Sequence, residues 1–147
     1  MQDFPHLYTV SVSTKPDSHV TVEADNLPSF EAAPPAAFGG PGNLWSPEDL
    51  LMAAAANCLV LSFKAIARAS KLEWLSIECE SRGTLDKVER KLLFTKVLST
   101  VKLRIPQDGS VEKAEKLLHK AEAACLVTNS MSAEVELECE VVNVPVL

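Results

Sequence analysis

The chain has 147 residues, of which 47% are hydrophobic and 23% are charged. This length and composition are typical of one globular domain, so we expect a single domain over residues 1–147 and exclude a disordered or fibrous protein. The formal net charge is −6, and Lys15 is the only lysine or arginine before Lys64. Because no basic stripe is present to attract phosphate groups, neither nucleic acid nor an anionic membrane surface is expected as a partner.

The N-terminal residues carry an acid and no apolar run, so they do not resemble a signal peptide. The longest uncharged apolar stretch runs from Leu50 to Phe63, which is shorter than the roughly 20 residues that a membrane-spanning helix needs. These features predict a soluble cytoplasmic protein. In a reducing compartment, the even number of four cysteines does not indicate structural disulfides.

The first third of the chain predicts a hairpin and then a long loop. Residues 8–12 and 20–22 alternate between apolar and polar side chains, a pattern typical of paired β-strands. Residues 27–42 contain prolines and glycines throughout, so we expect neither helix nor regular strand there. A loop of this length is often functional.

A long helix is predicted to follow, beginning at the segment Ser46–Asp49 and ending near Ser70. Ser46 is a suitable N-cap, proline is favoured at the first helical position, and two acidic residues face the positive end of the helix dipole. From Leu50 to Leu61 the helix is apolar nearly all round, which predicts a central, buried element. One small sheet cannot cover that much apolar surface, so we expect a second subunit to cover the remainder.

The rest of the chain predicts two strands, a helix and a final strand. The strands are expected at residues 75–80 and from about 92 to 105, with a hairpin connection around Asp86 and Lys87. An apolar stripe at helical spacing predicts an amphipathic helix over residues 111–125, and strict alternation predicts a strand over 134–141. The order ββαββαβ predicts an α+β fold with mainly antiparallel sheets.

The four thiols carry different expectations. Cys79 and Cys139 fall on apolar faces of strands, where a free cysteine behaves as a small buried hydrophobe. Cys58 lies mid-helix beside the unusual Asn57, and Cys125 ends the amphipathic helix on its core-facing stripe. These two thiols are either packed in the core or form a redox pair, and sequence spacing does not decide between the two. The sequence has no cysteines and histidines at the paired short spacing of a zinc site, so we expect no zinc. We also expect no cofactor.

Two stretches together resemble the OsmC/Ohr family, named for osmotically inducible protein C and organic hydroperoxide resistance protein. The first runs from Phe38 through the Gly-Gly-Pro-Gly loop and the Ser-Pro-Glu-Asp helix start to Asn57-Cys58-Leu59. The second is the amphipathic helix that ends in Ala-Ala-Cys125-Leu-Val. The resemblance implies an intertwined homodimer with long central helices between two sheets. It also implies a thiol-dependent peroxidase that prefers organic hydroperoxides, with Cys58 as the peroxidatic thiol and Cys125 as the resolving thiol.

Glu48 is the third residue that the resemblance marks as catalytic. It precedes Cys58 by ten residues, or about 15 Å along a helix axis, so it cannot touch the thiol of its own chain. We therefore predict that Glu48 joins the site of the partner subunit. The alternative is a favourable helix-dipole charge, which contributes about 0.3–1 kcal/mol.

The sequence departs from the family at one point. Active members carry an N-terminal arginine that pairs with the thiolate, whereas this chain has no arginine before Arg68. A thiol in an apolar site has a raised pKa unless a cation lies near it. The sequence does not identify which group activates Cys58. Lys15, His6 and His19 are the basic residues in the region concerned.

Substrate, reductant and alternative functions follow from the same resemblance. Phe38, Leu44, Trp45 and Asn57 are candidates for the wall of a substrate pocket, although simple packing of the loop is the slightly favoured explanation for the three from the loop. The family's reductants imply that electrons come from a dithiol or a lipoylated protein. The alternatives are a dimer that binds a small apolar ligand without turnover, which the missing arginine favours, and a thiol sensor of oxidation.

Overall fold

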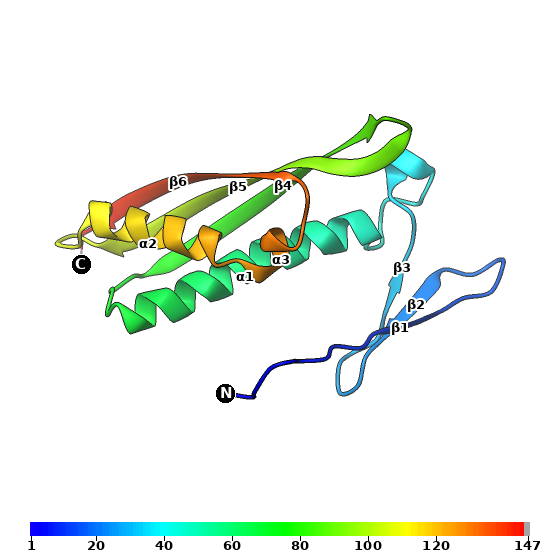
Figure 1. The fold of residues 1–147 in the computed structure, drawn as a ribbon, viewed down its shortest axis with the longest axis horizontal. Helices are drawn as coiled ribbons and strands as arrows, with labels where there is room; N and C mark the ends of the chain where they lie inside the picture. Colours follow the sequence, from blue (N-terminus) through cyan, green and yellow to red (C-terminus); the bar gives the residue numbers. More distant parts are fainter. Residues whose placement is uncertain (146–147) are drawn as a thin grey trace. The chain divides into compact units, whose positions relative to one another are not determined.

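The computed structural model describes residues 1–145, which form two compact units. The first unit ends at Leu51 and the second begins at Met52, so that helix α1 (Pro47–Ala69) runs through the boundary. The single-domain interpretation stays a prediction. The chain can be followed by colour in Figure 1.

The first unit contains a small antiparallel sheet in the order β1-β2-β3. Strands β1 (Ser11–Ser13) and β2 (Val20–Glu23) form the predicted hairpin, with Val12 opposite Val22. The expectation of an irregular loop over residues 27–42 was wrong in two places. Strand β3 (Phe30–Ala32) pairs with β2, and the short 3-10 helix η1 (Ala36–Phe38) follows it. The prolines flank these short elements rather than interrupt them, which is why the composition concealed them.

Helix α1 begins where the sequence predicted. The Asp49 N–H donates to Ser46 Oγ at 3.0 Å, and Ser46 Oγ donates to Asp49 Oδ2 at 2.9 Å. Ser46 is fully buried, so its hydroxyl both caps the helix and avoids the cost of an unpaired buried polar group. This cap fixes the residue at which the helix begins.

The second unit is built on a mixed sheet in the order β4-β5-β6. Strands β4 (Ser76–Val88) and β5 (Lys91–Pro106) are antiparallel, whereas β6 (Glu134–Val144) runs parallel to β5. Helices α2 (Val111–Ala123) and α3 (Leu126–Asn129) form the crossover that parallel pairing requires. Three of the four strand pairings are antiparallel, so the α+β prediction with mainly antiparallel sheets is confirmed.

Two details of this unit differ from the prediction. The β4–β5 turn is centred on Glu89 and Arg90, which have φ of 49° and 71°, rather than on Asp86 and Lys87. Residues other than glycine rarely adopt positive φ, so nothing in the composition of this segment marked these two residues as the turn. The second helix ends at Ala123, so Cys125 lies just beyond it, as the N-cap of α3.

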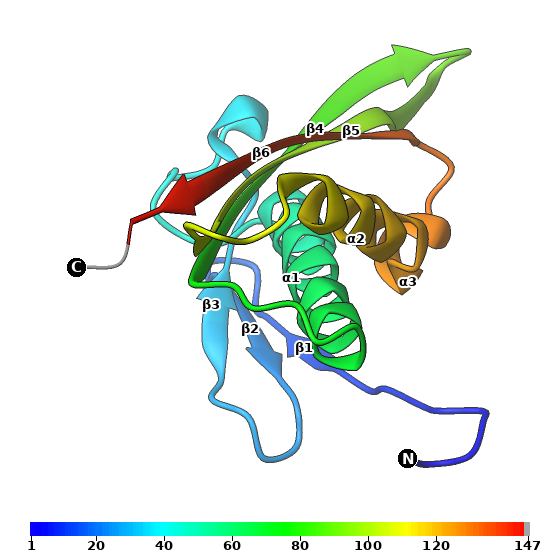
Figure 2. The ribbon, with the colours of Figure 1, turned by 90° about the vertical axis from the view of Figure 1, so that its left-hand side faces the viewer.

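Helices α1 and α2 cover one face of the β4-β5-β6 sheet (Figure 2). The core between them contains Phe63 from α1, Leu103 from β5 and Leu118 from α2, all fully buried. Only four α1 residues are buried, namely Ala55, Leu59, Phe63 and Ala67.

The sheet and α2 of one chain cover only one stripe of α1, so the expectation that a second subunit covers the remaining apolar surface stays a prediction. The helix is long and apolar enough to cross a membrane by length and composition, a test that core helices also pass. Leu61 shows how much apolar surface stays open, since it is 56% exposed.

Candidate active site

Cys58 lies in an open, mainly apolar pocket of about 500 Å³ within the second unit. Helix α1 provides one wall and the first turn of α3 the other. The lining residues are Ala54, Asn57, Cys58, Leu61, Ser62, Ala65, Leu126 and Val127. The Cys58 side chain is half-buried, so the thiol is shielded but reachable from solvent.

The surroundings of Cys58 favour its thiolate. Burial raises the pKa of the thiol, but hydrogen bonds from the Val127 N–H, the Cys125 side chain, the Ser62 hydroxyl and the Leu126 N–H lower it, and the net pKa is below the ordinary value. No lysine, arginine or histidine is among the residues that line the pocket. Hydrogen bonds rather than a nearby charge therefore set the ionisation of this thiol.

Cys125 is the thiol that the fold brings to Cys58. It is 1% exposed, and its Sγ is 4.0 Å from the Ala55 carbonyl oxygen on α1. Its extended backbone, with φ −67° and ψ 103°, turns the chain from α2 into α3. The two cysteines are 67 positions apart in the sequence, yet the Cys125 side chain is close enough to hydrogen-bond to Cys58. The structure thus brings together the two residues that the resemblance paired, while their roles stay predictions.

Cys79 and Cys139 differ from this pair in their ionisation. They flank Val101 in one row across the sheet, and both are half-buried. Burial raises the pKa of Cys79, against a hydrogen bond from Ser81, and nearby Cys125 raises it further. Burial also raises the pKa of Cys139, with a further contribution from Glu115. Both thiols are suited to packing rather than to nucleophilic attack at neutral pH.

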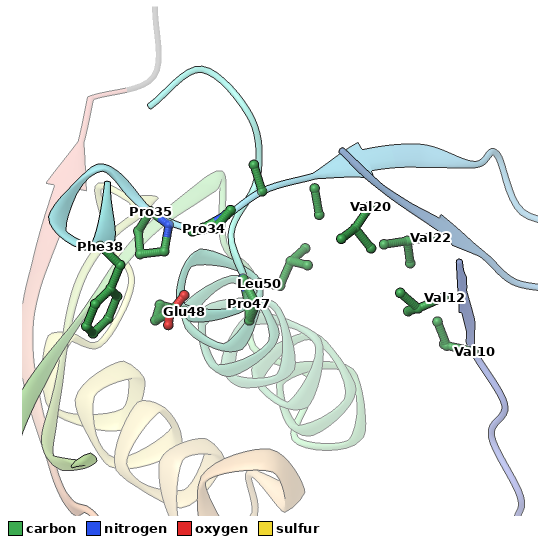
Figure 3. Close-up of a pocket in the computed structure, with 12 residues that line it drawn as sticks. Val10, Val12, Val20, Val22, Pro34, Pro35, Phe38, Pro47, Glu48 and Leu50 are labelled. Carbon is green, nitrogen blue, oxygen red and sulfur yellow. The ribbon is translucent and has the colours of Figure 1, made fainter. Parts of the chain in front are cut away.

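Glu48 lies in a second cavity, within the first unit. This cavity has a volume of about 640 Å³ and is lined almost entirely by aliphatic and proline side chains from the hairpin, the loop and the start of α1 (Figure 3). Phe38 is the one aromatic residue in the lining. The Glu48 Oε1 atom is buried and accepts no hydrogen bond within the described chain. A buried carboxylate oxygen without a donor is costly, so this atom is suited to a donor from outside the chain.

The other predicted pocket residues are divided between the two units. Asn57 is exposed and lines the Cys58 pocket, whereas Leu44 and Trp45 line neither cavity. Trp45 is 53% exposed, and its backbone bridges to Ala32. Across residues 1–145, no three or more His, Cys, Asp or Glu side chains are placed to hold a metal ion.

Three groups at the site were not found from the sequence. Ser62 follows Cys58 by four positions, the helical spacing at which side chains meet, so this signal was available. The N–H groups of Leu126 and Val127 had no sequence signal, because their position depends on how α3 packs against α1. Backbone donors are invisible to any reasoning based on side-chain type.

Fold and pocket together define a class of α+β protein in which a helix-borne cysteine with a lowered pKa lies beside a second thiol. Within that class the chain belongs to the family of OsmC-like proteins, whose sequence model matches residues 40–140.

Individual relatives and solved structures agree with the family assignment. The chain is 29% identical over 123 residues to the uncharacterized protein YmaD of Bacillus subtilis, a match that covers 82% of this chain and 81% of that protein. An OsmC-like protein of unknown function from Vibrio cholerae superposes with a TM-score of 0.85 at 23% identity, covering 92% of this chain and all of the other. An organic hydroperoxide resistance protein OsmC from Legionella pneumophila superposes with a TM-score of 0.73 at 25% identity, covering 95% and 100%.

Proposed function

We propose that the protein is a thiol-dependent peroxidase that reduces organic hydroperoxides, with Cys58 as the peroxidatic thiol and Cys125 as the resolving thiol. The observation that carries this proposal is the half-buried Cys58, whose pKa is lowered, beside the Cys125 thiol in an apolar pocket. A thiolate that is both accessible and stabilised is the form that reacts with peroxides. The name of the Legionella relative supports the same chemistry.

The reaction balances with these two thiols alone until the disulfide forms. The Cys58 thiolate attacks one peroxide oxygen and breaks the O–O bond, so the cysteine becomes a sulfenic acid and the substrate leaves as an alcohol after taking up a proton. The Cys125 thiol then condenses with the sulfenic acid, which forms a Cys58–Cys125 disulfide and releases water. A dithiol, free or carried as a lipoyl group on a protein, completes the cycle by exchange and is itself oxidised to a disulfide.

The proposed site also involves a second copy of the chain. Much of α1 is apolar and open, as Leu61 illustrates, so we propose a homodimer in which the second copy covers this face. The Glu48 Oε1 atom lacks a donor in its own chain, which supports a role for this carboxylate at the partner's site. We propose that the protein works in this form as a soluble cytoplasmic enzyme.

Intact mass and thiol mapping after exposure to peroxide test the reaction. Fully reduced protein treated with one equivalent of an organic hydroperoxide should lose two hydrogens, about 2 Da, and yield a Cys58–Cys125 peptide. Cys125→Ser should instead gain one oxygen, about 16 Da, at Cys58. Cys58→Ser is the matched control and should not change in mass on the same timescale. Both thiols remaining free after prolonged exposure would rule out the peroxidase.

A second candidate function is the binding of a small apolar ligand without turnover. The cavity of about 640 Å³ around Glu48 and Phe38 favours it, because its lining is almost wholly apolar. The same mass experiment separates the two functions. A protein that forms no disulfide, but whose thermal stability rises when an apolar probe such as a medium-chain alcohol is added, would support binding alone.

A further inference from the structure

The cavity around Glu48 combines an apolar lining with a single acidic group. It lies wholly within the first unit, and its volume of about 640 Å³ is in the range of small-molecule sites. All the lining residues except Glu48 are aliphatic, proline or aromatic. No lysine, arginine or histidine is among them, so no cationic side chain of the lining pairs with this carboxylate.

The Glu48 carboxylate lacks the donor that its neighbour has. Among the buried side-chain nitrogen and oxygen atoms of residues 1–145, Glu48 Oε1 is the one without a hydrogen-bond partner. The adjacent Asp49 differs, because its Oδ2 atom accepts a hydrogen bond from the Ser46 hydroxyl at 2.9 Å. An unpaired buried acceptor is costly, and a charged donor makes the stronger hydrogen bond to a carboxylate. The cavity therefore favours a ligand with a cationic donor.

The acidic group and the aliphatic side chains lie on different sides of the cavity. In Figure 3 Glu48 is on the same side as Phe38, whereas the hairpin valines are on the opposite side. Val10 and Val12 are exposed, so a ligand that covered them would remove apolar surface from water. A ligand that satisfies both sides has a cationic head and an aliphatic chain.

The charge of the first unit agrees with a cationic ligand. Residues 1–51 contain seven acidic side chains and a single lysine, Lys15. Lys15 lies in the hairpin turn and does not line the cavity. An excess of one charge over a surface attracts ligands of the opposite sign and repels those of the same sign. Between an alkylammonium ion and a fatty acid of the same chain length, this unit therefore favours the former.

We infer that the first unit binds small amphiphilic amines, with the protonated amine on Glu48 and the aliphatic chain against the hairpin valines. This inference rests on the second candidate function in taking the cavity as a ligand site, and it adds the chemical class of the ligand. It does not depend on the peroxide chemistry of Cys58.

Isothermal titration calorimetry of the full chain at neutral pH tests the inference with three probes of one chain length. Octylamine is protonated at this pH, as a lysine side chain is, whereas 1-octanol is neutral and octanoate is an anion. We expect octylamine to bind roughly ten- to hundredfold more tightly than 1-octanol, which is the gain from a charge-assisted hydrogen bond. Octanoate should bind more weakly than 1-octanol.

Three variants locate the amine and the chain. Glu48→Gln keeps the size of the side chain but removes its charge, so the preference for octylamine should disappear. Glu31→Gln is the matched control and should keep the preference, because Glu31 is an exposed acid of the same unit outside the lining. Val22→Thr adds a hydroxyl to the apolar side and should weaken octylamine and 1-octanol by a similar factor. If Glu48→Gln lacks a native circular dichroism spectrum, the three probes on the parent protein still decide.

The outcomes separate this inference from the functions proposed above. Equal affinities for octylamine and 1-octanol, or a preference that survives in Glu48→Gln, would overturn the amine and leave the binding of apolar ligands standing. Binding of neither probe would overturn both, and analytical ultracentrifugation at the same protein concentration would then show whether a second copy occupies the cavity. The Cys58–Cys125 disulfide is read by mass in a separate experiment, so the peroxidase is tested independently.

Discussion

Replacing Phe63 by alanine is expected to remove a large part of the stability of the second unit. Phe63 is fully buried between α1, the sheet and α2, and its ring meets the Trp74 ring edge-on, with centroids 5.6 Å apart and an interplanar angle of 83°. Truncating a buried phenylalanine costs about 3–5 kcal/mol, to which the aromatic pair contributes about 0.5–1.5 kcal/mol. For a chain of this size each kcal/mol lowers the melting temperature by about 2–4 °C. The Phe63→Ala variant should therefore melt about 6–20 °C below the parent.

The assay is thermal unfolding followed by far-ultraviolet circular dichroism, with urea unfolding as a second measure. Leu61→Ala is the matched control, because Leu61 lies on the same helix but is 56% exposed, and its truncation should cost no more than about 0.5 kcal/mol in a single chain. A loss at Leu61 that is larger and depends on protein concentration would instead indicate that a second copy covers this face. A fall of less than about 2 °C in Phe63→Ala would refute the assignment of this ring to the core.

Three further predictions concern the sheet, a helix cap and the thiols. Gly83→Ala should destabilise the protein by about 1–3 kcal/mol in urea, because an added Cβ would lie 2.6 Å from Met52 Sδ and 2.8 Å from Cε1 of the rigid Phe94 ring. Unchanged stability would show that this contact relaxes freely. Ser110→Ala removes the side-chain acceptor that caps α2 and should cost about 1 kcal/mol by the same measure, with no change expected in Cys58 reactivity. As pH rises, iodoacetamide should label Cys58 before Cys139, because hydrogen bonding lowers the pKa of Cys58 whereas burial raises that of Cys139. The reverse order, read by peptide mapping, would contradict both directions.

Local sequence signals predicted most of the helices and strands, and they placed Cys58 in the middle of the long helix. The Ser46 cap and the proline that follows it fixed the start of α1, because capping depends on residues adjacent in the chain. The turn and cap at Ser110 started α2 for the same reason. Alternation predicted the last strand, since side chains of a strand point to opposite faces with a period of two. In each case the interacting groups lie within a few positions of one another.

The tertiary structure decided what depends on groups far apart in the chain. Strand β6 is parallel to β5 because α2 and α3 carry the chain back across the sheet, and no local pattern of residues 134–144 records that direction. The proximity of Cys125 to Cys58, and the N–H groups of α3 that lower the pKa of Cys58, exist only because α3 packs against α1. The sequence alone determined how many cysteines the chain has and which helices and strands carry them. Only the packing of those elements decided which thiol has a lowered pKa, because a pKa depends on donors, burial and charge in three dimensions.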